Sequence, residues 1–293
     1  MKVFLSADPD ALERAISEFK NTATVEAEYG DRTVFGSVLT LCHHGKWAGN
    51  PAPCMHNEPV GVDAIGLSHI DLDALGGVLA IQGRKPEFRH FWMTAALVDL
   101  SGPHRLPDIL KPFDEETAEA LKDRINAFWA WAKRNRPPTV KGSEVKEVSE
   151  YIYKAYEALT AILNGDEDLL EDGREFEKQS ERLNEESFVE CKSGVIVRVS
   201  PEFVNMFYRP PKSLGAKFED VAYAVVAFNT RTGSITVSFE DSGMFSLSAV
   251  KIVQELWGPE AGGRDGIAGS PRGVRMGLKD LYDAAEAVRK ALW

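Results

Sequence analysis

The sequence predicts an α/β protein with a parallel-sheet N-terminal domain, a helical connector and a smaller α+β C-terminal domain. Over the first third of the chain, strand-like apolar runs alternate with polar loops and helical patterns, an order typical of a parallel sheet. From Asp114 to about Leu163 the apolar spacing becomes helical, and from Gly194 to Ser238 β-rich runs return. We expect the domain boundaries at these changes of pattern: residues 1–135, 136–190 and 191–293.

The first domain repeats the order strand, polar loop, helix. Pro9 opens a helical pattern, and Asp8 or Asp10 can cap its first turn. The expected elements are strands or apolar runs at 2–7, 33–41, 62–69 and 91–98, a loop at 45–59 and a helix at 74–81. Since ligand sites of parallel sheets lie at the carboxyl ends of the strands, we expect the functional residues there.

The rest of the chain divides into helices and a second strand-rich part. Asp114 caps one predicted helix, and a second predicted helix ends at Leu163. The acidic run at 166–190 is expected to be a solvated helical face or loop that links the domains. The elements expected after it are strands at 194–199, 221–229 and 234–238, a helix at 247–256, a glycine-rich loop at 262–273 and a helix at 278–292.

The composition excludes some classes of protein. Hydrophobic residues make up 44% and charged residues 27% of the 293 residues, which is normal for a globular protein. The net charge of −11 disfavours binding to long nucleic acid, because a phosphate backbone needs a basic surface. The charge therefore favours a small substrate over a polymer.

The sequence also bears on the compartment. No stretch approaches 18 uninterrupted apolar residues, so we expect no membrane span, and the N-terminus lacks the features of a signal peptide. The chain has three cysteines, Cys42, Cys54 and Cys191. This small and odd number argues against a disulfide framework. These features predict a cytoplasmic protein.

The histidines are concentrated in one part of the chain. All six lie in a 62-residue window: His43, His44, His56, His69, His90 and His104. Neutral imidazole and carboxylate are usual ligands of Mn, Fe and Zn, so this window predicts a metal site. Cys42 and Cys54 flank its first half and could be ligands or a nucleophile, although buried cysteines are more often small core residues.

The sharpest motif in the window is His69-x-Asp71-x-Asp73. If the strand continues, these three side chains share one face and could converge on a metal ion. The alternative is that one aspartate caps the next helix and His69 is an ordinary residue at a strand end.

Two further segments offer candidates. His43 and His44 follow a strand, where adjacent side chains point apart, so we expect one to bind metal and the other to orient it or to act in catalysis. Asp99 ends an apolar run close to His104, which makes it a further candidate ligand, although such an aspartate is often only a cap.

Several segments resemble motifs of the DHH phosphoesterase superfamily. Residues 69–76, His-Ile-Asp-Leu-Asp-Ala-Leu-Gly, resemble its His-x-Asp-x-Asp motif. Residues 40–44, Thr-Leu-Cys-His-His, resemble its Asp-His-His motif with Cys42 in the aspartate place, and residues 99–102, Asp-Leu-Ser-Gly, resemble its Asp-Thr-Gly motif. The order is permuted, because the His-His segment here precedes the His-x-Asp-x-Asp segment.

The C-terminal part resembles the DHH-associated domain. Residues 262–269, Gly-Gly-Arg-Asp-Gly-Ile-Ala-Gly, are similar to its Gly-Gly-His-x-x-Ala-Ala-Gly loop, with arginine in the histidine place. The resemblance implies that this loop binds substrate phosphate through backbone N–H groups and guanidinium groups. The candidate residues are Gly262, Gly263, Arg264, Gly269 and Arg272. The alternative is a plain glycine turn with surface arginines.

Membership of this family would imply a metal-dependent hydrolase of a small phosphoester or phosphoanhydride. The divalent metal would be Mn, with Zn or Fe as alternatives, and the substrate would lie between the two domains. Its partner would be a small phosphorylated molecule such as a nucleotide or short oligonucleotide, and a homodimer is compatible with this. The catalytic candidates are His43, His44 and His104, and the candidate metal ligands are His69, Asp71, Asp73, Asp99 and His43.

Two other functions remain open at this point. One is a Zn or Fe enzyme with non-phosphate chemistry that uses Cys42, Cys54 and the histidines. The other is a protein that binds phosphate or a nucleotide without turnover.

Overall fold

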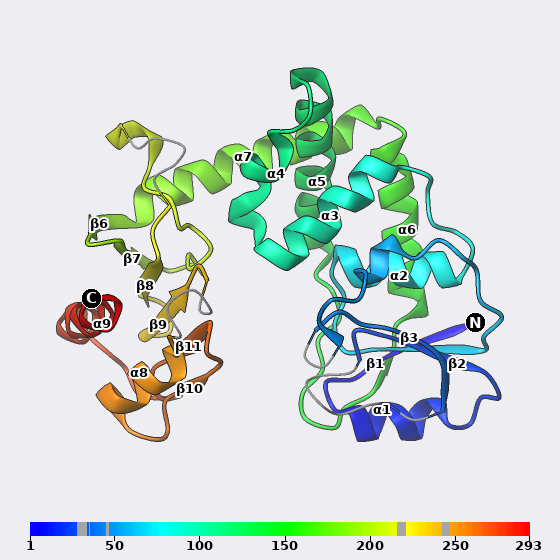
Figure 1. Ribbon diagram of the computed structural model, residues 1–293, viewed down its shortest axis with the longest axis horizontal. Helices are drawn as coiled ribbons and strands as arrows, with labels where there is room; N and C mark the ends of the chain where they lie inside the picture. The colour runs from blue at the N-terminus through cyan, green and yellow to red at the C-terminus, as the bar shows by residue number, and fades with distance from the viewer. Residues whose placement is uncertain (28–33, 35, 45–46, 216–220, 242–246) are drawn as a thin grey trace. The chain divides into compact units, whose positions relative to one another are not determined.

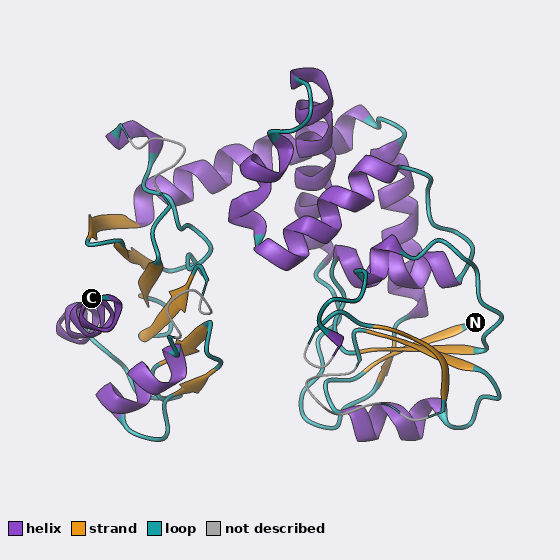
Figure 2. Ribbon diagram, in the orientation of Figure 1, coloured by secondary structure: helices purple, strands orange, loops and turns teal. Residues whose placement is uncertain are grey.

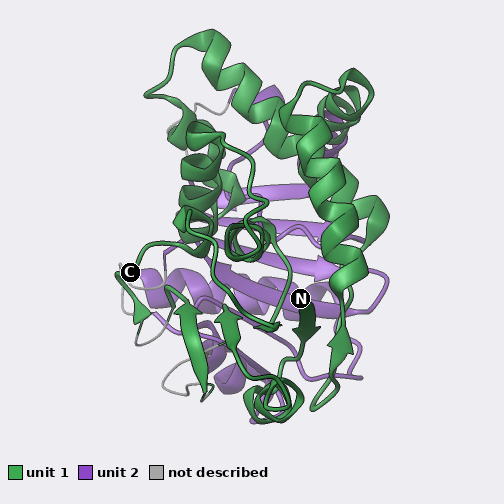
Figure 3. Ribbon diagram, turned by 90° about the vertical axis from the view of Figure 1, so that its right-hand side faces the viewer, with its two compact units in different colours: residues 1–177 green, residues 178–293 purple. Residues whose placement is uncertain are grey.

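The computed structural model describes all residues except 28–33, 35, 45–46, 216–220 and 242–246 (Figure 1). The chain divides into two compact units, residues 1–177 and 178–293 (Figure 3). Each unit combines helices with one sheet, and one sheet is mostly parallel, so the predicted α/β class is confirmed (Figure 2). The boundary between the units lies within the segment predicted as a connector.

The sheet of the first unit has the order β3-β2-β4-β1-β5. Its strands are β1 (Lys2–Leu5), β2 (Thr22–Val25), β3 (Ser37–Leu41), β4 (Ala64–Leu67) and β5 (Lys146–Glu147). The first four are parallel, and β5 runs antiparallel to β1 at the edge. The register pairs Val25 with both Leu41 and Leu67, so β2, β3 and β4 end at the same level.

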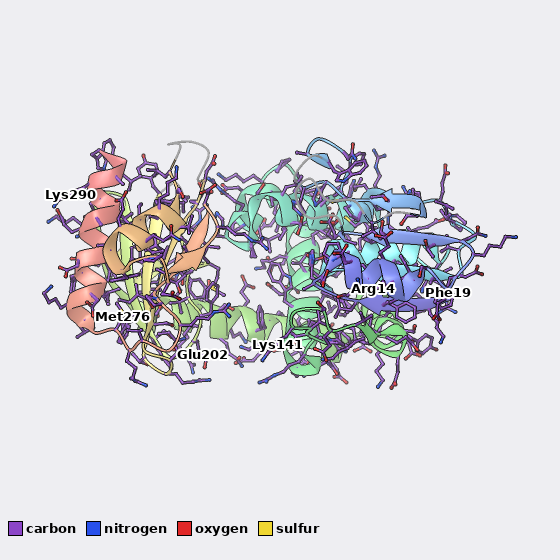
Figure 4. All side chains as sticks on the ribbon, turned by 90° about the horizontal axis from the view of Figure 1, so that it is seen from below. Arg14, Phe19, Lys141, Glu202, Met276 and Lys290 are labelled. Carbon is purple, nitrogen blue, oxygen red and sulfur yellow. The ribbon has the colours of Figure 1, made fainter. Side chains whose placement is uncertain are left out.

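Helices cover both faces of this sheet (Figure 1). Helix α1 (Pro9–Ile16) lies on one face, and its N-cap Asp8 accepts a hydrogen bond from the Asp10 amide at 2.9 Å, as the sequence predicts. Phe19, labelled in Figure 4, follows α1 and places its ring 5.7 Å from the Phe4 ring of β1. Helices α2 (Leu72–Ile81) and α6 (Ser149–Leu163) lie on the other face.

Further helices extend this second layer. They are α3 (Arg89–Ser101), α4 (Leu106–Leu110), α5 (Glu115–Asn135) and α7 (Glu167–Ser187), with 3-10 turns η2 (Pro53–Met55) and η3 (Pro103–Arg105). Asp114 caps α5 through the Thr117 amide, as predicted. The acidic run forms α7, which crosses α5 where Gly173 meets Ala127; a Cβ at Gly173 would lie 2.5 Å from the Ala127 nitrogen.

The apolar run at 91–98 does not fit the predicted alternation of strands and loops. It lies in helix α3, so Asp99 stands in the last turn of a helix and not at a strand end. A short, continuously apolar run is compatible with a helix as well as with a strand, and here α3 buries most of the run, including Phe91, Trp92 and Val98, while Leu97 remains exposed.

The second unit contains a six-stranded sheet in the order β10-β11-β9-β8-β7-β6. Its strands are β6 (Phe188–Lys192), β7 (Val195–Ser200), β8 (Ala224–Asn229), β9 (Ser234–Phe239), β10 (Gly262–Gly263) and β11 (Ile267–Gly269). β7 and β8 are parallel, and the other neighbours are antiparallel. Helices α8 (Ala249–Trp257) and α9 (Leu278–Leu292) pack on one face, and the short turn η4 (Lys212–Leu214) follows the 201–211 segment.

No helix in the described part of the chain is both long and apolar enough to cross a membrane.

Candidate metal centre

The polar residues of the candidate site follow three neighbouring parallel strands. Glu26 comes directly after β2, His43 and His44 come shortly after β3, and His69 comes shortly after β4. Since β2 lies between β3 and β4 and all three strands end in register, these segments meet at one edge of the sheet.

His43 is the centre of the cluster. Its Nε2 atom lies 2.9 Å from Asp99 Oδ2, 3.6 Å from Asp73 Oδ2 and 3.7 Å from Glu26 Oε1. His43, Asp73 and Glu26 are 2–3% exposed. His43, Asp73 and Asp99 form one group whose ligand atoms are close enough together to hold a metal ion.

A second group shares His43 with the first and consists of Glu26, His43 and His44. His44 Nε2 lies 3.3 Å from Glu26 Oε2 and 3.7 Å from Asp99 Oδ2. The expectation that the two histidines point apart is therefore wrong. Strand β3 ends at Leu41, so the alternation of a strand no longer applies at His43 and His44, and their rings lie 4.2 Å apart.

The polar atoms that face one another lack hydrogen-bond partners among the described residues. They are Glu26 Oε1, Asp73 Oδ2, Asp99 Oδ2 and His43 Nε2, all of them buried. Buried polar atoms without partners are costly, and their convergence is the arrangement that a bound cation would satisfy. Imidazole and carboxylate ligands together suit first-row divalent metals, so the residues present fit a metal ion.

The electrostatics of the cluster follow from this burial. Burial raises the pKa of Glu26 to about 8, and the charge of Asp73 adds to this effect. Burial also raises the pKa of Asp73 to about 7, and burial and the charge of Asp71 raise the pKa of Asp99. Without a cation, the cluster therefore holds protons near neutral pH, and a bound metal would replace them.

The imidazoles shift in the direction that suits metal ligands. Burial lowers the pKa of His43 and of His44, which keeps both rings neutral. A neutral imidazole has the free lone pair that a metal needs.

The His69-x-Asp71-x-Asp73 motif divides into two parts. The strand does not continue through it, because β4 ends at Leu67 and α2 begins at Leu72. Asp71 is the N-cap of α2 and accepts from the Ala74 amide at 2.8 Å, so the capping alternative is confirmed for this residue. Asp73 lies in the first turn of α2 and joins His43 and Asp99.

His69 and Asp71 form an ion pair beside the cluster. His69 Nε2 lies 3.0 Å from Asp71 Oδ2, and both side chains are more than one third exposed. Burial opposes the ionised forms, but the hydrogen bond between the two groups and the charges around them together outweigh it, raising the pKa of His69 and lowering the pKa of Asp71. Neither residue belongs to the two metal groups found among the described residues.

Other predicted residues lie outside these two groups. His104 stands on η3, its ring against Gly102, and Cys42 and Cys54 are buried. Cys54 donates its thiol hydrogen to the Trp92 carbonyl at 3.4 Å, and burial raises the pKa of this thiol far above its usual range. Within the described ranges, no cysteine takes part in either group.

The predicted phosphate loop belongs to the second unit and forms a β-hairpin. Arg264 N donates to Ile267 O at 2.7 Å, and Ile267 N donates to Arg264 O at 3.2 Å, which closes the turn. Gly263 has a φ of +153°, and a Cβ there would lie 2.4 Å from Ala268 Cα, so the hairpin itself requires this glycine. Gly262 pairs with Gly269 in the hairpin ladder, and Arg264 and Arg272 are exposed.

Glu26 is the residue that the sequence prediction missed. It follows β2, a four-residue strand of Thr22, Ala23, Thr24 and Val25 that was not predicted. Two threonines and a valine before an acidic residue are the signal that could have indicated a strand end with a ligand.

Comparisons with known proteins give no assignment. No family model matches the sequence, and no curated protein matches it.

Proposed function

We propose that this chain is a metal-dependent hydrolase that acts on a small phosphoester or phosphoanhydride. The observation that carries the metal-dependent part is the convergence of buried, unpartnered carboxylate and imidazole atoms on His43. The two overlapping groups of possible ligands share His43, whose Nε2 atom can bind one ion, so together they favour a metal site with several carboxylate and imidazole ligands; a divalent ion held in this way can activate water for the cleavage of phosphate esters.

The phosphate part of the proposal rests on the resemblance to the DHH superfamily. The resemblance is carried by the segments around His43, His69 and Asp99. His43 and Asp99 are members of the cluster, and His69 lies beside it. The permuted order of the segments is compatible with a common site, because His43 and Asp73 come within 3.6 Å although their motifs are exchanged along the chain. Mn is our preferred ion, since carboxylate and imidazole ligands without thiolate suit it.

The chain's own residues would contribute in three ways. Glu26, Asp73, Asp99, His43 and His44 would hold the metal. Bound divalent ions supply Lewis-acid polarisation of a phosphoryl group and make water more acidic. The burial of Glu26 and Asp73 keeps competing water away from the ligand atoms. The more exposed pair of His69 Nε2 and Asp71 Oδ2 would hold a proton next to the cluster.

An enzyme that uses a zinc–thiolate site is the less favoured candidate. Cys54 uses its thiol in a hydrogen bond to a backbone carbonyl and its amide in a hydrogen bond to Asp73. Its high thiol pKa also opposes thiolate formation.

The experiment that tests the proposal has two readouts. Metal content is measured after loading the protein with Mn, Zn or Fe(II), and hydrolysis is measured on a panel of phosphomonoesters, phosphodiesters, nucleotides and pyrophosphate. We expect the wild type to retain metal and to hydrolyse at least one class, Asp73→Asn to lose both properties, and the exposed control Glu18→Gln to keep both. Failure to retain any of the three metals would exclude the metal centre; retention without hydrolysis of any phosphate substrate would exclude the phosphate chemistry.

A further inference from the structure

A short segment lies unusually close to the helix that carries Asp73. Residues 53–57, which begin with the turn η2, pack on the first half of α2. Two consecutive glycines of α2 allow this approach. A Cβ at Gly76 would lie 2.5 Å from Cys54 Cβ, and a Cβ at Gly77 would lie 2.9 Å from Pro53 Cβ.

This approach brings a backbone amide to one oxygen of Asp73. The Cys54 amide donates to Asp73 Oδ1 at 3.0 Å, and this hydrogen bond is buried. The other oxygen, Oδ2, has no hydrogen-bond partner among the described residues and lies 3.6 Å from His43 Nε2. The carboxylate is thus held by one oxygen while the other faces the cluster.

Lys85 holds the 53–57 segment in place from outside the cluster. Its Nζ atom donates to the carbonyl of Cys54, to the carbonyl of His56 at 2.8 Å and to Asn57 Oδ1 at 2.7 Å. The same ammonium group lies 5.2 Å from the centre of the Trp92 ring. All three ammonium hydrogens therefore have acceptors on one segment, and the aromatic ring limits where the ammonium can lie.

We propose that Lys85 is a positioning residue for the metal centre. By holding the 53–57 segment against α2, it keeps the Cys54 amide on Asp73 Oδ1, so that Asp73 offers Oδ2 alone to the ion. This inference rests on the proposed metal-dependent function. It assigns to Lys85 a role in metal affinity although Lys85 does not belong to either group of possible ligands.

The test compares Mn²⁺ binding in Lys85→Met, Lys85→Arg and a matched control, Lys133→Met. Lys133 is an exposed lysine of the same unit whose Nζ lies 5.4 Å from the centre of the Phe176 ring. Calorimetric titration of the metal-free proteins, well below their melting temperatures, gives the affinity and the stoichiometry. Hydrogen exchange at the Cys54 amide reports directly on the contact with Asp73.

We expect Lys85→Met to weaken Mn²⁺ binding about tenfold without changing the stoichiometry, because loss of an outer partner of a metal ligand typically costs about 10- to 100-fold. Exchange at Cys54 should accelerate in the same variant, Lys85→Arg should recover part of the affinity, and Lys133→Met should match the wild type. If Lys85→Met lowers the melting temperature but binds Mn²⁺ like the control, Lys85 is only structural and the inference is wrong while the metal centre stands. If the wild type itself takes up no Mn²⁺, Zn²⁺ or Fe²⁺, both the inference and the proposed function fail.

Discussion

Replacing Glu26 by glutamine should stabilise the metal-free protein and at the same time weaken metal binding. Glu26 is 2% exposed and close to other carboxylates, which is why its pKa is raised from its ordinary value of 4.5 to about 8. Glutamine keeps nearly the same shape but carries no charge, so it removes the cost of a buried carboxylate. It also removes an anionic ligand that a divalent ion would use.

The size of the effect follows from the pKa. Between pH 4.5 and pH 8 the folded protein keeps a proton on Glu26 that the unfolded chain has released, so the stability of the metal-free protein falls as pH rises through this window. The shift of about 3.5 units corresponds to at most about 5 kcal/mol at about 1.4 kcal/mol per unit. Relaxation around the charge reduces this figure, and we expect a gain of about 2–4 kcal/mol for Glu26→Gln at pH 8.5 and almost none at pH 4.5.

The assay is urea unfolding of metal-free wild type, Glu26→Gln and the exposed control Glu18→Gln at pH 4.5, 6.5 and 8.5. The wild type and the control should lose stability across this range relative to Glu26→Gln. Titration with Mn²⁺ at pH 8.5 should show the opposite order, with Glu26→Gln at least tenfold weaker than the control, as expected when a charged ligand is lost. Equal pH slopes for Glu26→Gln and the wild type would show that Glu26 is not a buried, proton-holding member of the cluster.

Three further predictions test other parts of the site. The Mn²⁺ affinity of the wild type should rise from pH 6 to pH 8, because Asp73 and Glu26, with pKa values of about 7 and 8, must release protons; calorimetry in buffers of different ionisation enthalpy counts these protons. His43→Ala should lose more metal than His44→Ala, because His43 belongs to both groups and His44 to one, and metal analysis after desalting would contradict this if His44→Ala lost as much. Arg264→Ala should weaken binding of a phosphorylated substrate about ten- to a hundredfold without altering Mn²⁺ affinity, and unchanged substrate affinity would mean that the hairpin turn is only structural.

The elements with strong local signals could be predicted from the sequence. Helix α1 begins with a capping aspartate and a proline, and α9 has a regular apolar period, so both were predicted at or near their observed bounds. The short elements were harder. Strand β2 has four residues, all buried, and so lacks the alternation that marks a half-exposed strand, while the apolar run of α3 could not be distinguished from a strand.

The candidate site could be predicted in its location but not in its details. The concentration of histidines and the expected strand ends indicated that His43, Asp73 and Asp99 belong near one another. The distances confirm that they are close, although Asp73 and Asp99 lie in helices and not at strand ends. Asp71 and Asp73 have different roles because of where α2 begins. Asp71 is the N-cap, so its side chain accepts from a helix amide, whereas the side chain of Asp73 points toward His43, which follows β3. Such a difference of two residues lies within the uncertainty of any boundary predicted from sequence.

The order of strands in the first sheet explains why Glu26 has a central part in the cluster. β2 lies between β3 and β4, and each of these strands is followed by a segment with candidate ligands. A residue at the end of the middle strand can reach both neighbours. The carboxylate of Glu26 reaches the segment after β3, with one oxygen 3.7 Å from His43 and the other 3.3 Å from His44, and its backbone carbonyl accepts a hydrogen bond from the Ser68 hydroxyl after β4. The order of motifs along the chain has no influence on this geometry, because parallel strands joined by crossovers bring their carboxyl ends to one edge in any order. The permutation relative to the DHH pattern therefore does not count against a common metal centre. Unchanged Mn²⁺ affinity in Glu26→Gln would count against it.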